Sequence, residues 1–274
     1  MLKHRLITAA ILIPLIIFSV LLLPTELFAA LTSLFILLGA YEWGSFCGWK
    51  DRFSRLLYSS VIAFSLAASY YTLLYFPEIT TILLTITCLW WLIALYWVWR
   101  YQQGYDLLPT LPWLKAGLGL LVLSPAWLAL ILLHQYYERH WVIFLLVLIW
   151  TADSGAYFAG KKWGKTKLAA RVSPGKTFEG VLGALVTSGV VAVLYALLQQ
   201  MTWSTLLIFL AICLLTVLVS ILGDLVESLF KRQMDIKDSG QILPGHGGIL
   251  DRIDSLTAAT PVFVLSLLLL GDLF

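Results

Sequence analysis

The sequence predicts an all-α, polytopic integral membrane protein with about nine transmembrane helices and a cytoplasmic N-terminus. The first reason is composition: of 274 residues, 61% are hydrophobic and 12% are charged, and the mean hydropathy is +0.92. A soluble domain carries about 25% charged residues, because it needs a polar exterior. The other two reasons are the spacing of the apolar stretches and the distribution of charge along the chain.

Nine apolar stretches have the length of a membrane span, which is roughly 20 residues. We expect helices, because lipid offers no partner to an unpaired backbone amide and no alternating ten-residue pattern suggests a barrel. The first stretch is too long for a signal peptide, and no small-residue cleavage site follows it, so we expect it to be retained. The stretches are 6–23, 27–47, 57–76, 80–99, 112–133, 141–159, 178–198, 204–229 and 250–271.

The basic residues predict the orientation. If the N-terminus is cytoplasmic, every Lys and Arg except Arg139 falls in a cytoplasmic segment. This distribution follows the positive-inside rule, and it supports the helix count, because the loss of one helix would invert the later loops. Nine helices then place the C-terminus outside.

Four acidic residues lie where the eighth helix ends and the ninth begins. Asp224 and Glu227 share one helix face, and Asp251 and Asp254 repeat the spacing. A carboxylate in a membrane helix normally faces an aqueous cavity or a charged partner. Two such pairs on consecutive helices can converge, and carboxylate oxygens suit Mg²⁺. The alternative is that the acids only form ion pairs with neighbouring basic residues, but this does not explain their clustering with glycines and a histidine.

A second polar stretch contains Ser173-Pro-Gly-Lys-Thr177. It resembles the end of a nucleotide-binding P-loop, but Ala170 stands where the first glycine is required and no predicted strand precedes it, so we reject that site. Lys176 and Thr177 still offer phosphate donors, and the seventh helix begins directly afterwards with an N-terminus that favours anions. The alternative is a helix cap with ordinary cytoplasmic lysines.

Two further residues leave alternatives open. His246 lies between glycines that allow the backbone to approach a ligand closely. Its ring either donates to a phosphate or a base, or bonds a neighbouring acid. Glu42 is a lone carboxylate near the inner end of the second helix. It either reaches the same cavity or extends to the membrane interface.

Segment 228–254 resembles the signature of bacterial phosphatidate cytidylyltransferases (CDP-diacylglycerol synthases) at every defined position. The segments Asp153–Tyr157 and Ser173–Gly180 are similar to the other polar blocks of that family. The resemblance is strong in the C-terminal half and rests on architecture alone in the N-terminal half. The matching pattern is Ser228-x-Phe-Lys-Arg-x4-Lys237-Asp-x-Gly-x2-Leu-Pro-x-His246-Gly-Gly-Ile-x-Asp251-Arg-Ile-Asp254.

The resemblance implies that CTP and phosphatidate react to give CDP-diacylglycerol and pyrophosphate, in phospholipid biosynthesis at the bacterial cytoplasmic (inner) membrane. It implies Mg²⁺ on Asp224 and Asp251 with a second cation such as K⁺ nearby, a homodimer, lipid as a partner and no nucleic acid. We add Asp254 to the metal ligands and Lys237 to the catalytic residues. We predict contacts with the substrates for Ser173, Lys176, Thr177, Ser228, Lys231, Arg232, His246, Arg252 and Asp153.

The residues suit such a reaction. The phosphate of phosphatidate is already an anionic nucleophile, so the main obstacle is the approach of two anions, which metal and basic side chains offset. We therefore divide the chain into residues 1–140, with helices 1–5, and residues 141–274, with helices 6–9 and the cytoplasmic nucleotide and metal site.

Two other functions remain to be distinguished. A CTP-using polyprenol or phytol kinase would need a base to deprotonate an alcohol, and Asp153 is available for that role. A transporter would place ionisable residues at mid-membrane and contain an internal repeat, and the sequence shows neither.

Overall fold

The computed structural model describes residues 13–240 and 247–271. Eight helices in this part are long and apolar enough to cross a membrane, and a shorter apolar helix, Ile13–Leu22, precedes them. The protein is therefore a multi-pass membrane protein, as predicted, although part of the first predicted span (6–23) lies outside the described residues. The eight helices are α2 (Thr25–Phe46), α3 (Arg52–Tyr75), α4 (Pro77–Gln102), α5 (Pro112–Tyr136), α6 (Arg139–Trp163), α7 (Phe178–Leu198), α8 (Trp203–Gln233) and α9 (Leu250–Leu270).

Several helices extend beyond their apolar stretches. α3 begins five residues earlier than the stretch 57–76, because Asp51 caps it by accepting a hydrogen bond from the Ser54 amide at 2.7 Å. α8 continues past residue 229 to Gln233 and carries Lys231 and Arg232 in its last turn, where positive charge favours the helix dipole. Apolar length therefore predicts the span but not the helix end.

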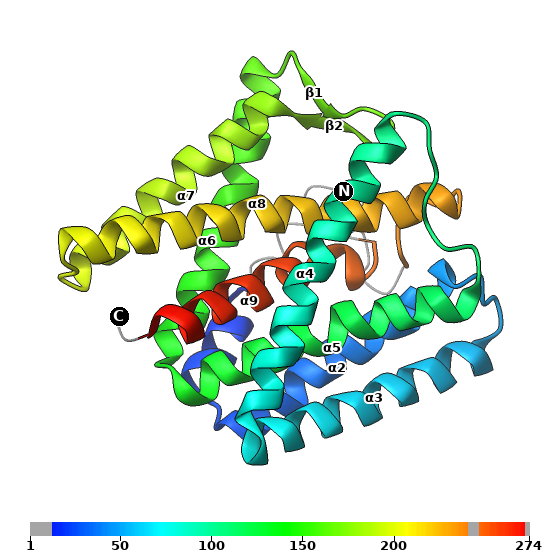
Figure 1. Cartoon of the computed structure of the whole chain (residues 1–274), viewed down its shortest axis with the longest axis horizontal. Helices are drawn as coiled ribbons and strands as arrows, with labels where there is room; N and C mark the ends of the chain where they lie inside the picture. The colour runs from blue at the N-terminus through cyan, green and yellow to red at the C-terminus, as the bar shows by residue number, and fades with distance from the viewer. Residues whose placement is uncertain (1–12, 241–246, 272–274) are drawn as a thin grey trace.

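A short antiparallel β-hairpin, which the sequence did not predict, joins α6 to α7. Strand β1 (Lys167–Ala169) pairs with β2 (Ser173–Thr177), with Lys167 opposite Thr177. Proline and glycine within β2 are poor strand formers, so no pattern indicates it. Figure 1 shows the hairpin at the joined ends of α6 and α7, reaching toward the end of α4. There the Arg171 amide donates to Gln102 Oε1 at 3.1 Å.

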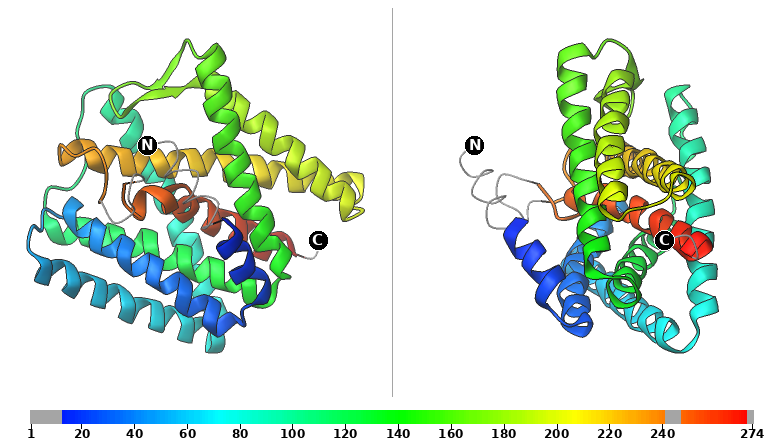
Figure 2. Two further views of the ribbon diagram at one scale, coloured as in Figure 1. Left: turned by 180° about the vertical axis from the view of Figure 1, so that it is seen from behind. Right: turned by 90° about the vertical axis from the view of Figure 1, so that its left-hand side faces the viewer.

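Helix α9 lies inside the bundle. Figures 1 and 2 show it between α8 and the layer formed by α2, α3 and α5, and it packs on α8, α5, α4 and α2. α9 thus joins the two halves into which we divided the sequence at residue 140. α6 and α7 approach closely through glycines, since a Cβ on Gly183 would lie 2.3 Å from the Cβ of Ala159.

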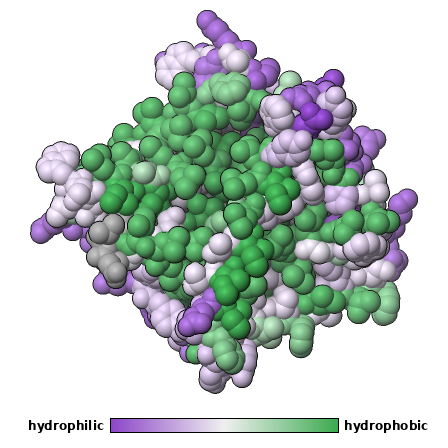
Figure 3. Space-filling model, viewed as in Figure 1, coloured by the Kyte–Doolittle hydropathy of each residue, from purple (hydrophilic) through white to green (hydrophobic). Residues whose placement is uncertain are grey.

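The face of the molecule drawn in Figure 3 is apolar over most of its area. Figure 3 shows hydrophobic residues over α7, α8 and α4, and hydrophilic residues gathered around the β1–β2 hairpin and along the edge where α8 ends. A broad apolar belt suits contact with lipid chains. We call the polar end, which holds the hairpin and the end of α8, the basic end of the bundle. Its cytoplasmic orientation stays a prediction.

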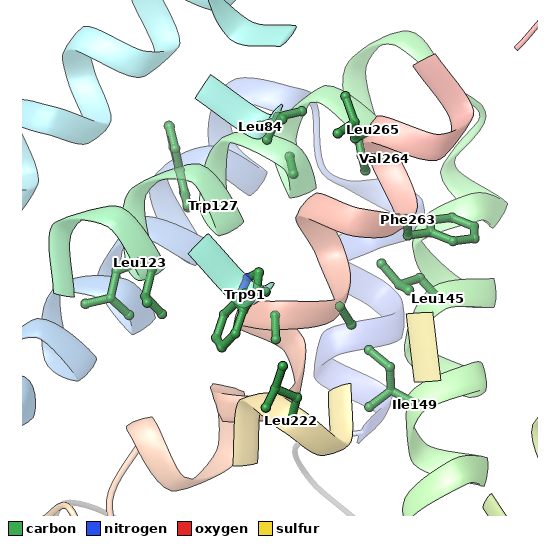
Figure 4. Close-up of a cluster of buried hydrophobic side chains, with 14 of the residues drawn as sticks. Leu84, Trp91, Leu123, Trp127, Leu145, Ile149, Leu222, Phe263, Val264 and Leu265 are labelled. Carbon is green, nitrogen blue, oxygen red and sulfur yellow. The ribbon is translucent and has the colours of Figure 1, made fainter. Parts of the chain in front are cut away.

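The buried core surrounds α9. Phe263, Val264 and Leu265 of α9 are buried, and Figure 4 shows them among side chains of α4, α5, α6 and α8, such as Trp91 and Leu222. A helix packed on all sides is held firmly, because interiors are close-packed and resist displacement. The first turn of α9, which carries two of the predicted site residues, is therefore anchored to a rigid element.

Candidate active site

Four residues predicted to bind substrate or metal meet at the basic end, although they come from three elements. Lys176 of β2 forms an ion pair with Asp224 of α8, with 2.8 Å between Nζ and Oδ2. The Ser228 hydroxyl, one turn further along α8, donates to Asp224 Oδ1 at 3.3 Å. Asp153 of α6 interacts electrostatically with both Asp224 and Lys176. The hairpin therefore brings its lysine to the carboxylates of the neighbouring helices.

Gly223 allows α8 and α9 to approach at the level of the acids. A Cβ at this position would lie 2.6 Å from the backbone oxygen of Asp254, so any larger residue would separate the helices. The close packing leaves the Asp254 carboxyl in electrostatic contact with both Asp224 and Glu227. The predicted convergence of two carboxylate pairs is confirmed.

A lysine bridges one acid of each pair, Glu227 of α8 and Asp251 of α9. Lys231 Nζ lies 2.8 Å from Asp251 Oδ1 and 3.5 Å from Glu227 Oε1. Asp251 also accepts hydrogen bonds from the amides of Ser239, at 3.1 Å, and Gly248, at 2.8 Å. Asp251 thus ties together the two described ends (234–240 and 247–249) of the segment between α8 and α9, which we call the α8–α9 loop.

Glu42 of α2 lies directly beneath this loop. The side chain is 2% exposed, and its Oε2 atom accepts hydrogen bonds from the Leu250 amide at 2.8 Å and the Ser239 hydroxyl at 3.1 Å. Of the two alternatives that the sequence left open, Glu42 therefore points into the protein toward the site rather than outward to the interface.

Two of the predicted substrate contacts also have structural partners. Thr177 is buried and caps α7, where its hydroxyl accepts from the Gly180 amide at 3.1 Å. Arg232 Nε donates to the carbonyl of Val172 at 3.1 Å, which holds the turn of the hairpin against α8. The helix cap expected as an alternative for Thr177 is thus present, and the hydroxyl retains a proton with which to donate.

The other predicted site residues lie around this cluster. Ser173 opens β2 and is half-buried, whereas Lys237 and Arg252 are exposed at the two ends of the α8–α9 loop. His246 lies outside the described residues, so both alternatives for its ring stay open. The predicted roles of these residues remain predictions.

The donor set fits Mg²⁺. Five carboxylates, those of Asp153, Asp224, Glu227, Asp251 and Asp254, share two lysines. Glu227 is 4% exposed, and Lys231 Nζ lies 3.5 Å from its Oε1 atom. Such an excess of oxygen donors attracts a hard cation.

Among the described residues, no three His, Cys, Asp or Glu side chains are arranged to hold an ion by themselves. Mg²⁺ does not require such a set, because it usually takes one or two carboxylates and completes its shell with water and substrate phosphates. The cluster therefore suits a metal that arrives with a nucleotide better than a closed structural metal site.

The chain is similar to one family model and to several named proteins. Residues 3–270 match the model of the cytidylyltransferase family. A Pseudomonas aeruginosa protein named phosphatidate cytidylyltransferase is 43% identical over 264 residues, 96% of each chain. Proteins of the same name from Haemophilus influenzae and Bacillus subtilis are 37% identical over 280 residues (96% of this chain, 97% of the relative) and 46% identical over 128 residues (46% of each). The chain belongs to the cytidylyltransferase family.

Proposed function

We propose that this protein is a phosphatidate cytidylyltransferase, which transfers CMP from CTP to phosphatidate and releases CDP-diacylglycerol and pyrophosphate. One observation carries the proposal: Lys176, Asp224 and Asp153 meet at the basic end of a membrane bundle. The nearly full-length relatives that bear this name support it.

The reaction exchanges one phosphoanhydride bond for another. A phosphate oxygen of phosphatidate attacks the α-phosphorus of CTP, the new P–O–P link forms, and the bond between the α- and β-phosphates breaks as pyrophosphate leaves. The attacking group is already ionised near neutral pH, so no strong general base is required. The chain must instead bring two anions together and stabilise the charge that builds on the phosphates.

Basic and hydroxyl side chains are proposed to bind the phosphates. Lys176 of β2, whose Nζ lies 2.8 Å from Asp224 Oδ2, is the first of these side chains. Arg232 and Arg252 can bind phosphate oxygens in pairs through their planar guanidinium groups, and Lys237 is the proposed catalytic lysine. The remaining proposed contacts are made by Ser173, Thr177, Ser228, Lys231, His246 and Asp153.

Asp224, Asp251 and Asp254 are the residues that would hold Mg²⁺, with a second cation such as K⁺ nearby. When bound there, Mg²⁺ supplies Lewis-acid polarisation of the α-phosphate. Lysines hold two of these carboxylates in place: Lys176 forms an ion pair with Asp224, and Lys231 forms one with Asp251.

The site lies at the end of an apolar belt, which suits a substrate with two different halves. The acyl chains of phosphatidate can stay in lipid while its headgroup reaches the basic end. We propose that this end faces the cytoplasm of a bacterial inner membrane, where CTP is present, and that the protein works as a homodimer. The charge distribution supports the orientation.

The position of a label in CTP tests the proposal against the kinase alternative. Purified protein is incubated with Mg²⁺, phosphatidate, a polyprenol and CTP labelled either at the α- or at the γ-phosphate, and the lipid product is identified. Cytidylyl transfer predicts a lipid labelled only from the α-position, with the γ-label released in pyrophosphate. A polyprenol acceptor labelled from the γ-position, with phosphatidate unchanged, would contradict the proposal.

A further inference from the structure

The start of α9 lacks a cap from its own sequence. The first amides of a helix have no partner within the helix and are usually satisfied by a side chain at the N-cap position. In α9 that position is Ile249, whose side chain cannot accept a hydrogen bond. The Leu250 amide instead donates to Glu42 Oε2 at 2.8 Å, so a residue of α2 caps a helix about 200 residues away in the chain.

The same oxygen atom is linked to the site acids through one serine. The Ser239 hydroxyl donates to Glu42 Oε2 at 3.1 Å, while the Ser239 amide donates to Asp251 at 3.1 Å. Asp251 follows Leu250 directly in the sequence. A shift of the Glu42 carboxylate would therefore move the Leu250 backbone, which precedes Asp251, and the Ser239 amide, which Asp251 binds. The turn that carries Asp254 would move with them.

Two glycines make room for this carboxylate. A Cβ on Gly240 would lie 2.1 Å from Glu42 Oε1, and one on Gly248 would lie 2.5 Å from Oε2. Neither glycine has a positive φ. The structure thus gives a packing reason for a glycine at both positions: the carboxylate of α2 occupies the space where a side chain would lie.

We propose that Glu42 is a positioning residue for the cytidylyl transfer proposed above: it caps α9 and fixes the two described ends of the α8–α9 loop, and thereby sets the places of Asp251 and Asp254. The proposal rests on that function. The bonds from the Leu250 amide and the Ser239 hydroxyl both reach Oε2, and the Ile249 amide also approaches this carboxylate. An amide oxygen can accept the same two bonds, so glutamine should substitute for glutamate.

Kinetics of substituted enzymes test this role. For Glu42→Ala we expect kcat to fall at least about tenfold, because small displacements of reacting groups are costly, while the KM for CTP stays within about threefold of wild type. Glu42→Gln should keep kcat within about threefold, because it keeps the acceptor. Glu26→Ala, an exposed carboxylate on the same helix, is the matched control and should leave kcat unchanged.

A double substitution separates positioning from folding. Gly240→Ala alone should lower kcat, because the new methyl displaces the Glu42 carboxylate. In the Glu42→Ala background the methyl has room, so Gly240→Ala should add less than about a twofold further loss. Non-additivity of this kind marks residues in direct contact.

Several outcomes would overturn the inference: full activity of folded Glu42→Ala enzyme, equal impairment of the Gln and Ala variants, or losses that simply multiply in the double variant. If the Glu42→Ala variant does not fold, two single substitutions still test the inference. Glu42→Gln must keep kcat within about threefold of wild type, and Gly240→Ala must lower it. Inactive wild-type protein in the same assay would instead contradict the proposed function, so the two failures are distinguishable.

Discussion

The acidic cluster has an open half and a closed half. In the open half, the side chains of Asp224 and Lys176 are 35% and 24% exposed, and both interact electrostatically with Asp153 of α6. In the closed half, the side chains of Asp251 and Lys231 are 10% and 13% exposed, and Asp251 also accepts hydrogen bonds from the backbone amides of Ser239 and Gly248. Carboxylates with the same spacing on consecutive helices thus have different surroundings.

The carboxylates of one membrane site can therefore have different roles. An ionised group in a membrane helix needs a partner or water. The Asp224 side chain is partly exposed and accessible to substrate. The Asp251 carboxylate accepts hydrogen bonds from backbone amides and from Lys231. We infer that the open half binds the nucleotide, and that the closed half also holds the two described ends of the α8–α9 loop in place. Substitutions in the two halves should therefore affect activity and stability to different degrees.

The largest effect on activity alone is expected in the open half. Asp224→Asn removes a charged oxygen ligand with little change in volume, and we expect turnover to fall below detection. The melting temperature should change little, because partly exposed ion pairs contribute little to stability. Turnover and thermal unfolding of purified protein measure the two effects. Activity within about threefold of wild type would move the metal site elsewhere.

Asp251→Asn should also abolish turnover, but with a loss of stability that the Asp224 variant does not show. The substitution leaves Lys231 without its closest carboxylate in a largely buried position, and removal of one partner from a buried pair costs about 3 kcal/mol. Thermal unfolding in detergent, run side by side for both variants, makes the comparison. Equal melting temperatures would remove the distinction between the halves.

Lys176→Ala should act on one substrate more than on the other. If β2 holds the triphosphate, loss of a charged donor raises the KM for CTP by about tenfold, equivalent to about 1.4 kcal/mol, with the KM for phosphatidate within about threefold. Lys165→Ala is the matched control, since Lys165 is exposed in the segment before the hairpin. An unchanged CTP dependence would leave Lys176 as a structural partner of Asp224.

The smallest effect is expected at Thr177. Thr177→Ala removes the cap of α7, which should lower the free energy of unfolding by about 0.5–2 kcal/mol. The KM for CTP should rise less than in the Lys176 variant, because the hydroxyl of Thr177 is already engaged by the helix. Thr177→Ser keeps the cap and should behave as wild type. A larger effect on KM than that of Lys176→Ala would reverse the assignment of the two residues.

Much of this site could be predicted because charge stands out in an apolar chain. Asp153, Asp224 and Asp254 interrupt long hydrophobic stretches, and such interruptions are rarely tolerated without function. Their convergence could be predicted because the order of the helices brings these positions to the same end of the bundle. The spans themselves followed from apolar length, whereas their ends depended on local caps such as that of Asp51.

What the sequence did not show depends on contacts between distant segments. Glu42 caps a helix about 200 residues away, and nothing near Glu42 in the sequence indicates that partner. The sequence of the β1–β2 hairpin has no strand pattern. Its two strands pair where the chain reverses direction between α6 and α7. Ser239 belongs to a polar loop, yet it is buried against Glu42 and Asp251.

Whether Asp224 binds the cation that accompanies CTP is tested most directly by changing the metal preference. In a variant with alanine at Cys47, Cys88 and Cys213, all free in this structure, Asp224→Cys replaces a hard oxygen ligand by a thiolate, which prefers softer metals. For each metal, the turnover of the variant is divided by that of the cysteine-free parent under the same conditions. We expect this ratio to be close to zero with Mg²⁺ and at least about tenfold higher with Cd²⁺ or Mn²⁺. A variant that stays equally inactive with all three metals, while the parent works with each of them, would contradict a metal-binding role for Asp224.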